Sequence, residues 1–84
     1  MRLQFSKDAL KQLEKISSRN EAKKITRKLE QLETEPLVGK KLAGELADQF
    51  SLRAWPYRII YQVYPKAQTV LIIHIEHRQG VYKN

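Results

Sequence analysis

The fold is decided by residues 50–82, which have the sequence FSLRAWPYRIIYQVYPKAQTVLIIHIEHRQGVY. Side chains along a β-strand point alternately to the two faces of a sheet, so an apolar residue at every second position indicates a strand with one buried face. Segments 49–54, 57–64 and 69–77 alternate in this way. Trp55-Pro56 and residues 65–68 form the expected turns between them. The sequence therefore predicts three short consecutive strands.

One face of these strands is expected to be apolar and the other charged. The residues expected to face a common core are Phe50, Leu52, Ala54, Tyr57, Ile59, Tyr61, Val63, Leu71, Ile73 and Ile75. The same alternation places on the opposite face Arg53, Arg58, His74, Glu76 and Arg78. That face is cationic with one carboxylate and one imidazole, which makes it the candidate functional surface.

The preceding residues predict one further strand and two helices. Residues 1–5 alternate as a strand does, and Ser6 is a suitable N-cap for a helix of about three turns. Ser18 and Glu21 fit a capping box that opens a second helix, and Pro36 ends this helix near Thr34. Apolar residues at helical spacing follow these caps: Ala9, Leu10, Leu13 and Ile16, then Ala22, Ile25, Leu29 and Leu32.

The two helices are separated by only a few residues, so we expect an antiparallel hairpin whose apolar faces cover the apolar face of the sheet. Residues 37–48 are expected to be a connection, with a short turn around residues 45–48. The predicted fold class is α+β, with the order β-α-α-β-β-β and a mostly antiparallel sheet. Residues 1–84 are expected to form a single domain.

Composition narrows the class of protein. The chain has no cysteine, which excludes disulfides and thiolate metal sites and suits a reducing compartment. No apolar run approaches the length needed to span a membrane, so a cytoplasmic location is the simplest expectation. Lys and Arg number 16 against 9 Asp and Glu, a net charge of +7 that favours a polyanionic partner such as nucleic acid or an acidic protein.

Several chemistries are disfavoured. His74 and His77 lie on opposite faces of a regular strand, so no metal site is expected, and no Gly-rich phosphate loop or nucleophile elbow is present. Metal-free RNA cleavage stays open, because the substrate's 2′-OH is the nucleophile and arginine suits the phosphorane charge. The groups available for it are Arg53, Arg58, Arg78, His74, His77, Glu76 and Tyr82.

Each of these residues also has a structural interpretation. Arg53 and Arg58 can be solvated or can pair with Glu76, and Tyr82 can be a packing anchor. His77 has the parity of the core and can be a half-buried structural histidine. From the pattern alone, a binding surface is therefore favoured over a catalytic site.

The order of the motifs resembles the RelE/ParE toxin superfamily of bacterial and archaeal toxin–antitoxin modules. The residues that carry the resemblance are residues 41–46 (KLAGEL), Leu52-Arg53, residues 57–61 (YRIIY), His77-Arg78 and Val81-Tyr82. The resemblance spans almost the whole chain. It implies a microbial-ribonuclease-like fold, no metal or other cofactor, and a neighbouring RelB-like antitoxin that covers the basic face.

In the RelE branch the resemblance implies cleavage of mRNA in the ribosomal A site by attack of the 2′-OH. It implies that Arg58 and Arg78 contact the phosphate, that Tyr82 lies near the nucleophile or stacks on a base, and that Arg53 contacts RNA. His77 belongs to the same closing motif. The implied partners are mRNA on the ribosome and, only through the antitoxin, operator DNA.

The chain departs from the RelE pattern at two lysine positions, which here are Gln49 and Ser51. Neither can act as a cationic acid or base, although both lie where RNA is expected to bind. Residues that could replace the lysines in binding or proton transfer are Lys40, Lys41, His74, Glu76 and His77. The general base is left unassigned by this departure.

The departure keeps two other functions open. The ParE branch shares the fold, inhibits DNA gyrase by binding and lacks the ribonuclease residues. A third hypothesis is a weakly active or inactive toxin that acts mainly as an antitoxin-bound co-repressor of its own operon. The arginine at 58, the His77-Arg78 pair and Tyr82 favour the RelE branch.

Overall fold

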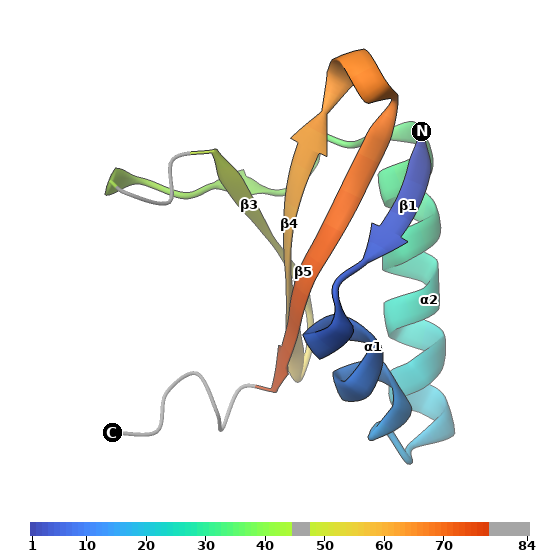
Figure 1. Cartoon of the computed structure of the whole chain (residues 1–84). Helices are drawn as coiled ribbons and strands as arrows, with labels where there is room; N and C mark the ends of the chain where they lie inside the picture. Colours follow the sequence, from blue (N-terminus) through green and yellow to red (C-terminus); the bar gives the residue numbers. More distant parts are fainter. Residues whose placement is uncertain (45–47, 78–84) are drawn as a thin grey trace.

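The structure is a computed structural model that describes residues 1–44 and 48–77. Its elements are, in order, β1 (Arg2–Phe5), α1 (Lys7–Glu14), α2 (Arg19–Thr34), β2 (Lys40–Lys41), β3 (Gln49–Ala54), β4 (Tyr57–Tyr64), the 3-10 helix η2 (Pro65–Ala67) and β5 (Thr69–His77). The strands form one sheet in the order β1-β5-β4-β3-β2, with β1 parallel to β5 and the other pairs antiparallel. Both helices lie on the same face of this sheet (Figure 1). The expected α+β fold is confirmed, and β2 is a strand that the pattern did not predict.

Serine caps begin both helices where the sequence predicts them. The Ser6 hydroxyl accepts a hydrogen bond from the Ala9 N–H at 3.0 Å, and the Ser18 hydroxyl accepts one from the Glu21 N–H at 3.3 Å. Helix α2 ends two residues before Pro36, as expected. Within the described ranges, no helix has the length and apolar character required to cross a membrane.

Helix α1 is shorter than expected. It ends at Glu14 after about two turns, and the Lys15 N–H, which lies within reach of three preceding carbonyls, closes the last turn. Leu10 was expected on the apolar face, but its side chain is about half exposed. Ile16 lies beyond the helix and still packs against the core.

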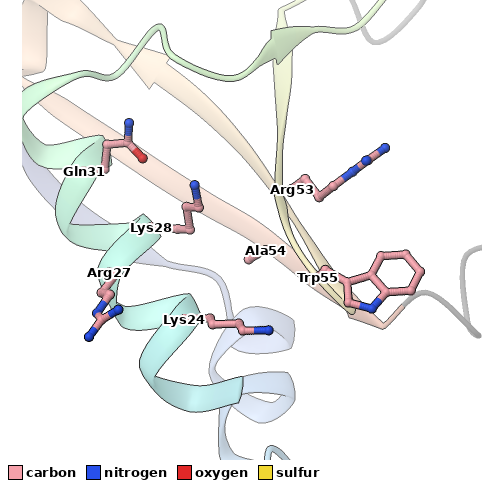
Figure 2. Close-up of a pocket in the computed structure, with 7 residues that line it drawn as sticks. All are labelled: Lys24, Arg27, Lys28, Gln31, Arg53, Ala54 and Trp55. Carbon is pink, nitrogen blue, oxygen red and sulfur yellow. The ribbon is translucent and has the colours of Figure 1, made fainter. Parts of the chain in front are cut away.

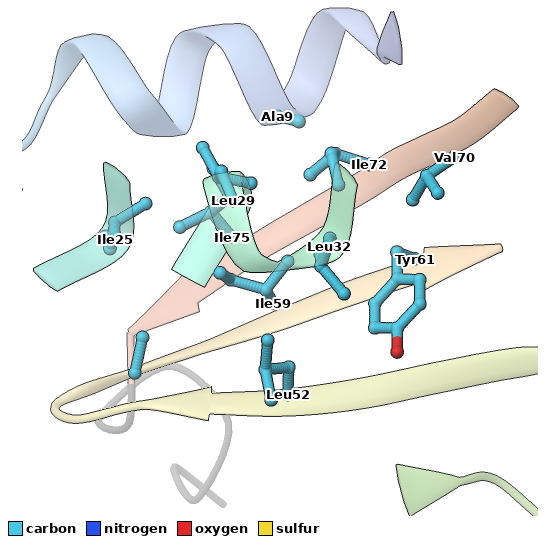
Figure 3. Packing of buried hydrophobic residues seen from close by; sticks show 11 residues of the cluster. Ala9, Ile25, Leu29, Leu32, Leu52, Ile59, Tyr61, Val70, Ile72 and Ile75 are labelled. Carbon is cyan, nitrogen blue, oxygen red and sulfur yellow. The ribbon is translucent and has the colours of Figure 1, made fainter. Parts of the chain in front are cut away.

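The core lies between the two helices and the sheet (Figure 3). Its buried members are Ala9, Ile25, Leu29, Leu32, Leu52, Ala54, Ile59, Tyr61, Val70, Ile72 and Ile75. Phe50, Tyr57 and Val63 pack against this cluster. The residues of β3 and β4 that were expected to face the core therefore do so.

Strand β5 contains a bulge that changes which of its residues face the core. Ile60 of β4 pairs with His74, and the next residue, Tyr61, pairs with Ile72, so Ile73 has no direct partner. The prediction that Leu71 and Ile73 face the core is wrong, since Val70 and Ile72 are fully buried there instead. Beyond the bulge the expected alternation holds, with Ile75 in the core.

Candidate functional site

The face of the sheet that is turned away from the helices carries charged and polar side chains from four strands. In cross-strand register Arg53 lies opposite Arg58, and Arg58 lies opposite Glu76. His74 lies opposite Ile60, two residues from Arg58, and therefore shares this face. We call this surface the cationic face and define it by Lys40, Gln49, Ser51, Arg53, Arg58, His74 and Glu76.

Placing Arg53 directly opposite Arg58 is unfavourable for the fold. Like charges that face each other across two strands repel, by up to about 1 kcal/mol relative to a neutral pair. Glu76, on the other side of Arg58, offsets part of this repulsion. A bound polyanion would remove the rest, so the arrangement suits a phosphate-bearing partner better than it suits an isolated domain.

Two adjoining hollows lie in the cationic face. The first encloses about 400 Å³ and is lined by Val38, Gly39, Lys40, Leu42, Ser51, Leu52, Arg53 and Arg58. The second encloses about 430 Å³ and is lined by Leu42, Gln49, Arg58, Ile60, Ile73, His74 and Glu76. Arg58 and Leu42 line both hollows, so Arg58 lies between a cationic hollow and one that holds the imidazole and the carboxylate.

A close approach between Gly39 and Tyr61 holds β2 at the edge of the first hollow. The Gly39 N–H donates to the Tyr61 hydroxyl at 2.9 Å, and the Tyr61 ring stacks on Phe50 with centroids 5.2 Å apart. A Cβ on residue 39 would lie 2.6 Å from that hydroxyl oxygen and 2.9 Å from the Ser51 carbonyl oxygen. Only glycine fits, and it brings Lys40 opposite Ser51 on the cationic face.

Helix α1 fixes the bulge from the other side of the sheet. β1 pairs with β5 only as far as Ile72, so later backbone groups of β5 need other partners. The Ser6 hydroxyl donates to the Ile73 carbonyl at 2.6 Å, and the Ile75 N–H donates to Oε1 of Gln12 at 2.7 Å. These two bonds bracket His74 and hold the register that keeps it on the cationic face.

His77 does not join the other candidate residues. It pairs with Tyr57, and the two rings meet edge to face with centroids 5.0 Å apart. Burial raises the pKa of Tyr57. Glu21 on α2 raises this pKa further, both through its negative charge and through a hydrogen bond with the Tyr57 side chain. Tyr57 and His77 therefore lie on the helix side of the sheet, which supports the structural interpretation of His77.

The remaining predicted residues divide between those that the structure places and those that it does not. Lys41 pairs with Phe50, so its alternation puts it on the face opposite Lys40. Arg78 and Tyr82 lie outside the described residues, as do Glu45 and Leu46 of the motif. Across the described part of the chain, no three His, Asp or Glu side chains gather as a metal site would require.

The sequence pattern did not predict a second basic surface. Lys24, Arg27 and Lys28 of α2 line a groove together with Arg53 and Trp55 (Figure 2). The helical half of the chain is nearly balanced in charge, so its total charge gave no sign of this surface. The spacing of the three cations, which repeats at three and four residues and puts them on one side of a helix, was the available signal.

Comparison with known proteins identifies the family. Residues 3–82 match the family model described as the ParE toxin of type II toxin–antitoxin systems. The chain is 35% identical to Toxin RelG of Mycobacterium tuberculosis over 82 residues, which cover 96% of this chain and 94% of the relative.

Solved structures agree with this assignment. The structure resembles a chain of the RelBE2 toxin–antitoxin complex from M. tuberculosis with a TM-score of 0.80 and 36% identity, covering 92% of this chain and 96% of the other. It also resembles the isolated RelE toxin of E. coli with a TM-score of 0.77 and 28% identity, covering 90% and 82%. The chain therefore belongs to the RelE/ParE superfamily and is a toxin of a type II toxin–antitoxin system.

Proposed function

We propose that this toxin is a ribosome-dependent mRNA endonuclease that inhibits translation by cutting mRNA in the A site, without a metal ion or cofactor. The observation that carries the proposal is the position of Arg58. It lies between Arg53 and Glu76 in register and lines both hollows of the cationic face, with His74 in the second. A phosphate bound there would meet a guanidinium and two groups able to move protons.

The cleavage step follows from these groups. The 2′-oxygen attacks the adjacent phosphorus, the bond from phosphorus to the 5′-oxygen breaks, and the products are a 2′,3′-cyclic phosphate and a free 5′-hydroxyl. Arg58, with Arg78 as its proposed partner, binds the phosphate oxygens and stabilises the charge of the phosphorane. Arg53, Lys40, Ser51 and Gln49 hold the flanking RNA.

Two proton transfers are needed, one from the 2′-hydroxyl and one to the leaving 5′-oxygen. His74 and Glu76 are the groups that we assign to them, since both line the second hollow beside Arg58. Tyr82 is proposed to lie near the nucleophile or to stack on a base. His77 is no longer favoured for proton transfer, because it packs against Tyr57 on the other side of the sheet.

A cognate RelB-like antitoxin is the proposed partner that neutralises the toxin. The similar RelBE2 toxin from M. tuberculosis was solved in a toxin–antitoxin complex. On this chain, Leu37 is 69% exposed, and its neighbour Val38, which lines the first hollow, is 43% exposed. An acidic, amphipathic antitoxin segment would cover these apolar side chains and the cationic face together, and operator DNA would be reached only through it.

Inhibition of DNA gyrase by binding is the second candidate. The family model is that of a ParE toxin, and Gln49 and Ser51 stand where the RelE pattern has lysines. A toxin of this kind would use the cationic face for binding and would leave RNA intact.

A purified system separates the two. The toxin is added to ribosomes programmed with a defined mRNA, to the same mRNA alone, and to a gyrase supercoiling reaction. The proposal predicts cuts with 5′-hydroxyl ends only on the ribosome, lost in Arg58→Ala and kept in Arg19→Ala, an exposed arginine of α2. Inhibited supercoiling with intact mRNA would establish the ParE-like function instead.

A further inference from the structure

The second basic surface is a groove between α2 and the end of β3. It encloses about 570 Å³ and is lined by Lys24, Arg27, Lys28, Gln31, Arg53, Ala54 and Trp55. Figure 2 shows the helix residues on one side of it and Arg53 and Trp55 on the other. The helix residues of this groove lie outside the cationic face and have no part in the RNA cleavage proposed above.

From its chemistry we infer that this groove binds single-stranded RNA. Among its described lining residues, four carry a positive charge and none carries a carboxylate. Lys24 and Lys28 are four residues apart on α2, a rise of about 6 Å along the helix axis. This rise is similar to the separation of successive phosphates in an extended single strand, so the two lysines can meet neighbouring phosphates.

Trp55 supplies the second element of a single-strand site. Its side chain is 50% exposed at the rim of the groove, although a large aromatic ring usually buries most of its surface. Basic grooves that hold single strands combine cations for the backbone with aromatic rings on which bases stack. Lysines at helical spacing opposite an exposed indole reproduce that combination.

The groove is continuous with the cationic face. Arg53 lines both the groove and the first hollow, where Lys40 and Arg58 lie. β2 pairs with β3 only at Phe50 and Ser51, so β2 does not extend along the last residues of β3. A strand of RNA can therefore pass from the cationic face over the end of β3 into the groove. That the same RNA occupies both surfaces rests on the proposed function, whereas RNA binding in the groove does not.

An amphipathic antitoxin helix would fit this groove less well. Such a helix inserts several large apolar side chains into an apolar cleft. Trp55 and Ala54 are the apolar residues among its described lining residues, and Ala54 is only 3% exposed, so the groove lacks a row of large apolar side chains.

Trp55 is the single tryptophan of the chain, so its fluorescence reports on the groove directly. The probe is an eight-nucleotide single-stranded RNA with 2′-O-methyl groups, which cannot be cut by 2′-hydroxyl attack. We expect it to quench the Trp55 emission of the full chain with an affinity that falls steeply with salt, and a duplex of the same sequence to quench less.

Matched variants assign the binding to the groove. Each neutralised phosphate contributes about 0.7 to the slope of log K against log salt for single strands. Lys24→Gln combined with Lys28→Gln should therefore lower that slope by about 1.4, while Lys24→Arg with Lys28→Arg should retain it. The control is Lys11→Gln with Lys15→Gln, two exposed lysines of the α1 region with the same spacing and the same change in charge.

The outcomes are distinct from those of the cleavage test, because the probe is not a substrate. Equal slopes for the groove and control variants would overturn the inference. So would quenching by a poly-glutamate peptide without quenching by RNA, which would assign the groove to an acidic protein. RNA quenching with no ribosomal cleavage would support the groove and contradict the proposed function alone.

Discussion

Gln12 provides the sharpest test of how the fold builds the cationic face. Its Oε1 accepts the Ile75 N–H at 2.7 Å, beyond the point at which β1 stops pairing with β5. Gln12→Leu keeps a side chain of similar size and removes the acceptor. Ile75 is 2% exposed, so its N–H would lose its hydrogen bond with little access to water.

The expected loss can be estimated. A buried backbone N–H left without a partner lowers the free energy of unfolding by about 1–3 kcal/mol. Because the bond between Ile75 and Gln12 is only partly buried, we expect a loss of about 1–2 kcal/mol. A domain of this size loses roughly 4–8 °C in Tm for each kcal/mol. Gln12→Leu should therefore melt roughly 4–16 °C below the parent chain in a thermal scan followed by far-ultraviolet circular dichroism.

Two further measurements separate the hydrogen bond from general damage. Gln12→Glu retains an acceptor oxygen at the same place and should lose less than half as much stability. Hydrogen exchange should accelerate at the Ile75 amide in Gln12→Leu and remain slow in Gln12→Glu. An unchanged Tm together with an unchanged Ile75 exchange rate in Gln12→Leu would refute the claim that α1 fixes the bulge.

Three further predictions concern the edge of the site and its chemistry. Gly39→Ala places a Cβ 2.6 Å from the Tyr61 hydroxyl oxygen, so we expect a loss of about 1–3 kcal/mol in urea unfolding; full stability would show that β2 moves freely. Burial raises the pKa of Tyr61 above its ordinary value of 10.0, and a hydrogen bond from Gly39 partly offsets this rise. Because the unfolded chain then loses the phenol proton at a lower pH than the folded chain does, folding stability should fall as pH rises above about 10. The fall should be shallower in Tyr61→Phe, and equal slopes would contradict this assignment. Ser51→Lys restores one lysine of the RelE pattern and should raise the rate of ribosomal cleavage, by up to about 100-fold if the lysine moves a proton; a slower variant would argue against that chemistry.

Most of the architecture was predictable because it depends on local patterns. The alternation in β3 and β4 identified the face that packs on the helices, and the serine caps located both helix starts. The same alternation correctly grouped Arg53 with Arg58 on the opposite face, since both strands are regular and pair without a shift.

The errors arose where tertiary contacts decide the structure. The bulge at Ile73 depends on partners supplied by α1, Ser6 and Gln12, which are more than sixty residues away in the chain. Leu71 and Ile73 are apolar, so their composition gave no sign that they would leave the core. Strand β2 depends on Gly39 meeting Tyr61, a contact that no local pattern reveals.

The candidate site was predicted in part for the same reason. His74 and Glu76 reached the expected face because they follow the bulge and the regular pairing resumes there. The groove beside α2 was missed because it joins the helix to Trp55 in a turn, and neither segment alone indicates a site. The roles of Arg78 and Tyr82 stay predictions.

The most direct test of the central claim is primer extension on translated mRNA after brief induction of the toxin. Parallel inductions use Arg58→Ala and the exposed control Arg19→Ala. We predict new 5′ ends within the coding region that depend on translation, disappear in Arg58→Ala and persist in Arg19→Ala. Intact mRNA in arrested cells would contradict the claim and point to gyrase, and intact mRNA in growing cells would indicate a toxin that acts only through its antitoxin.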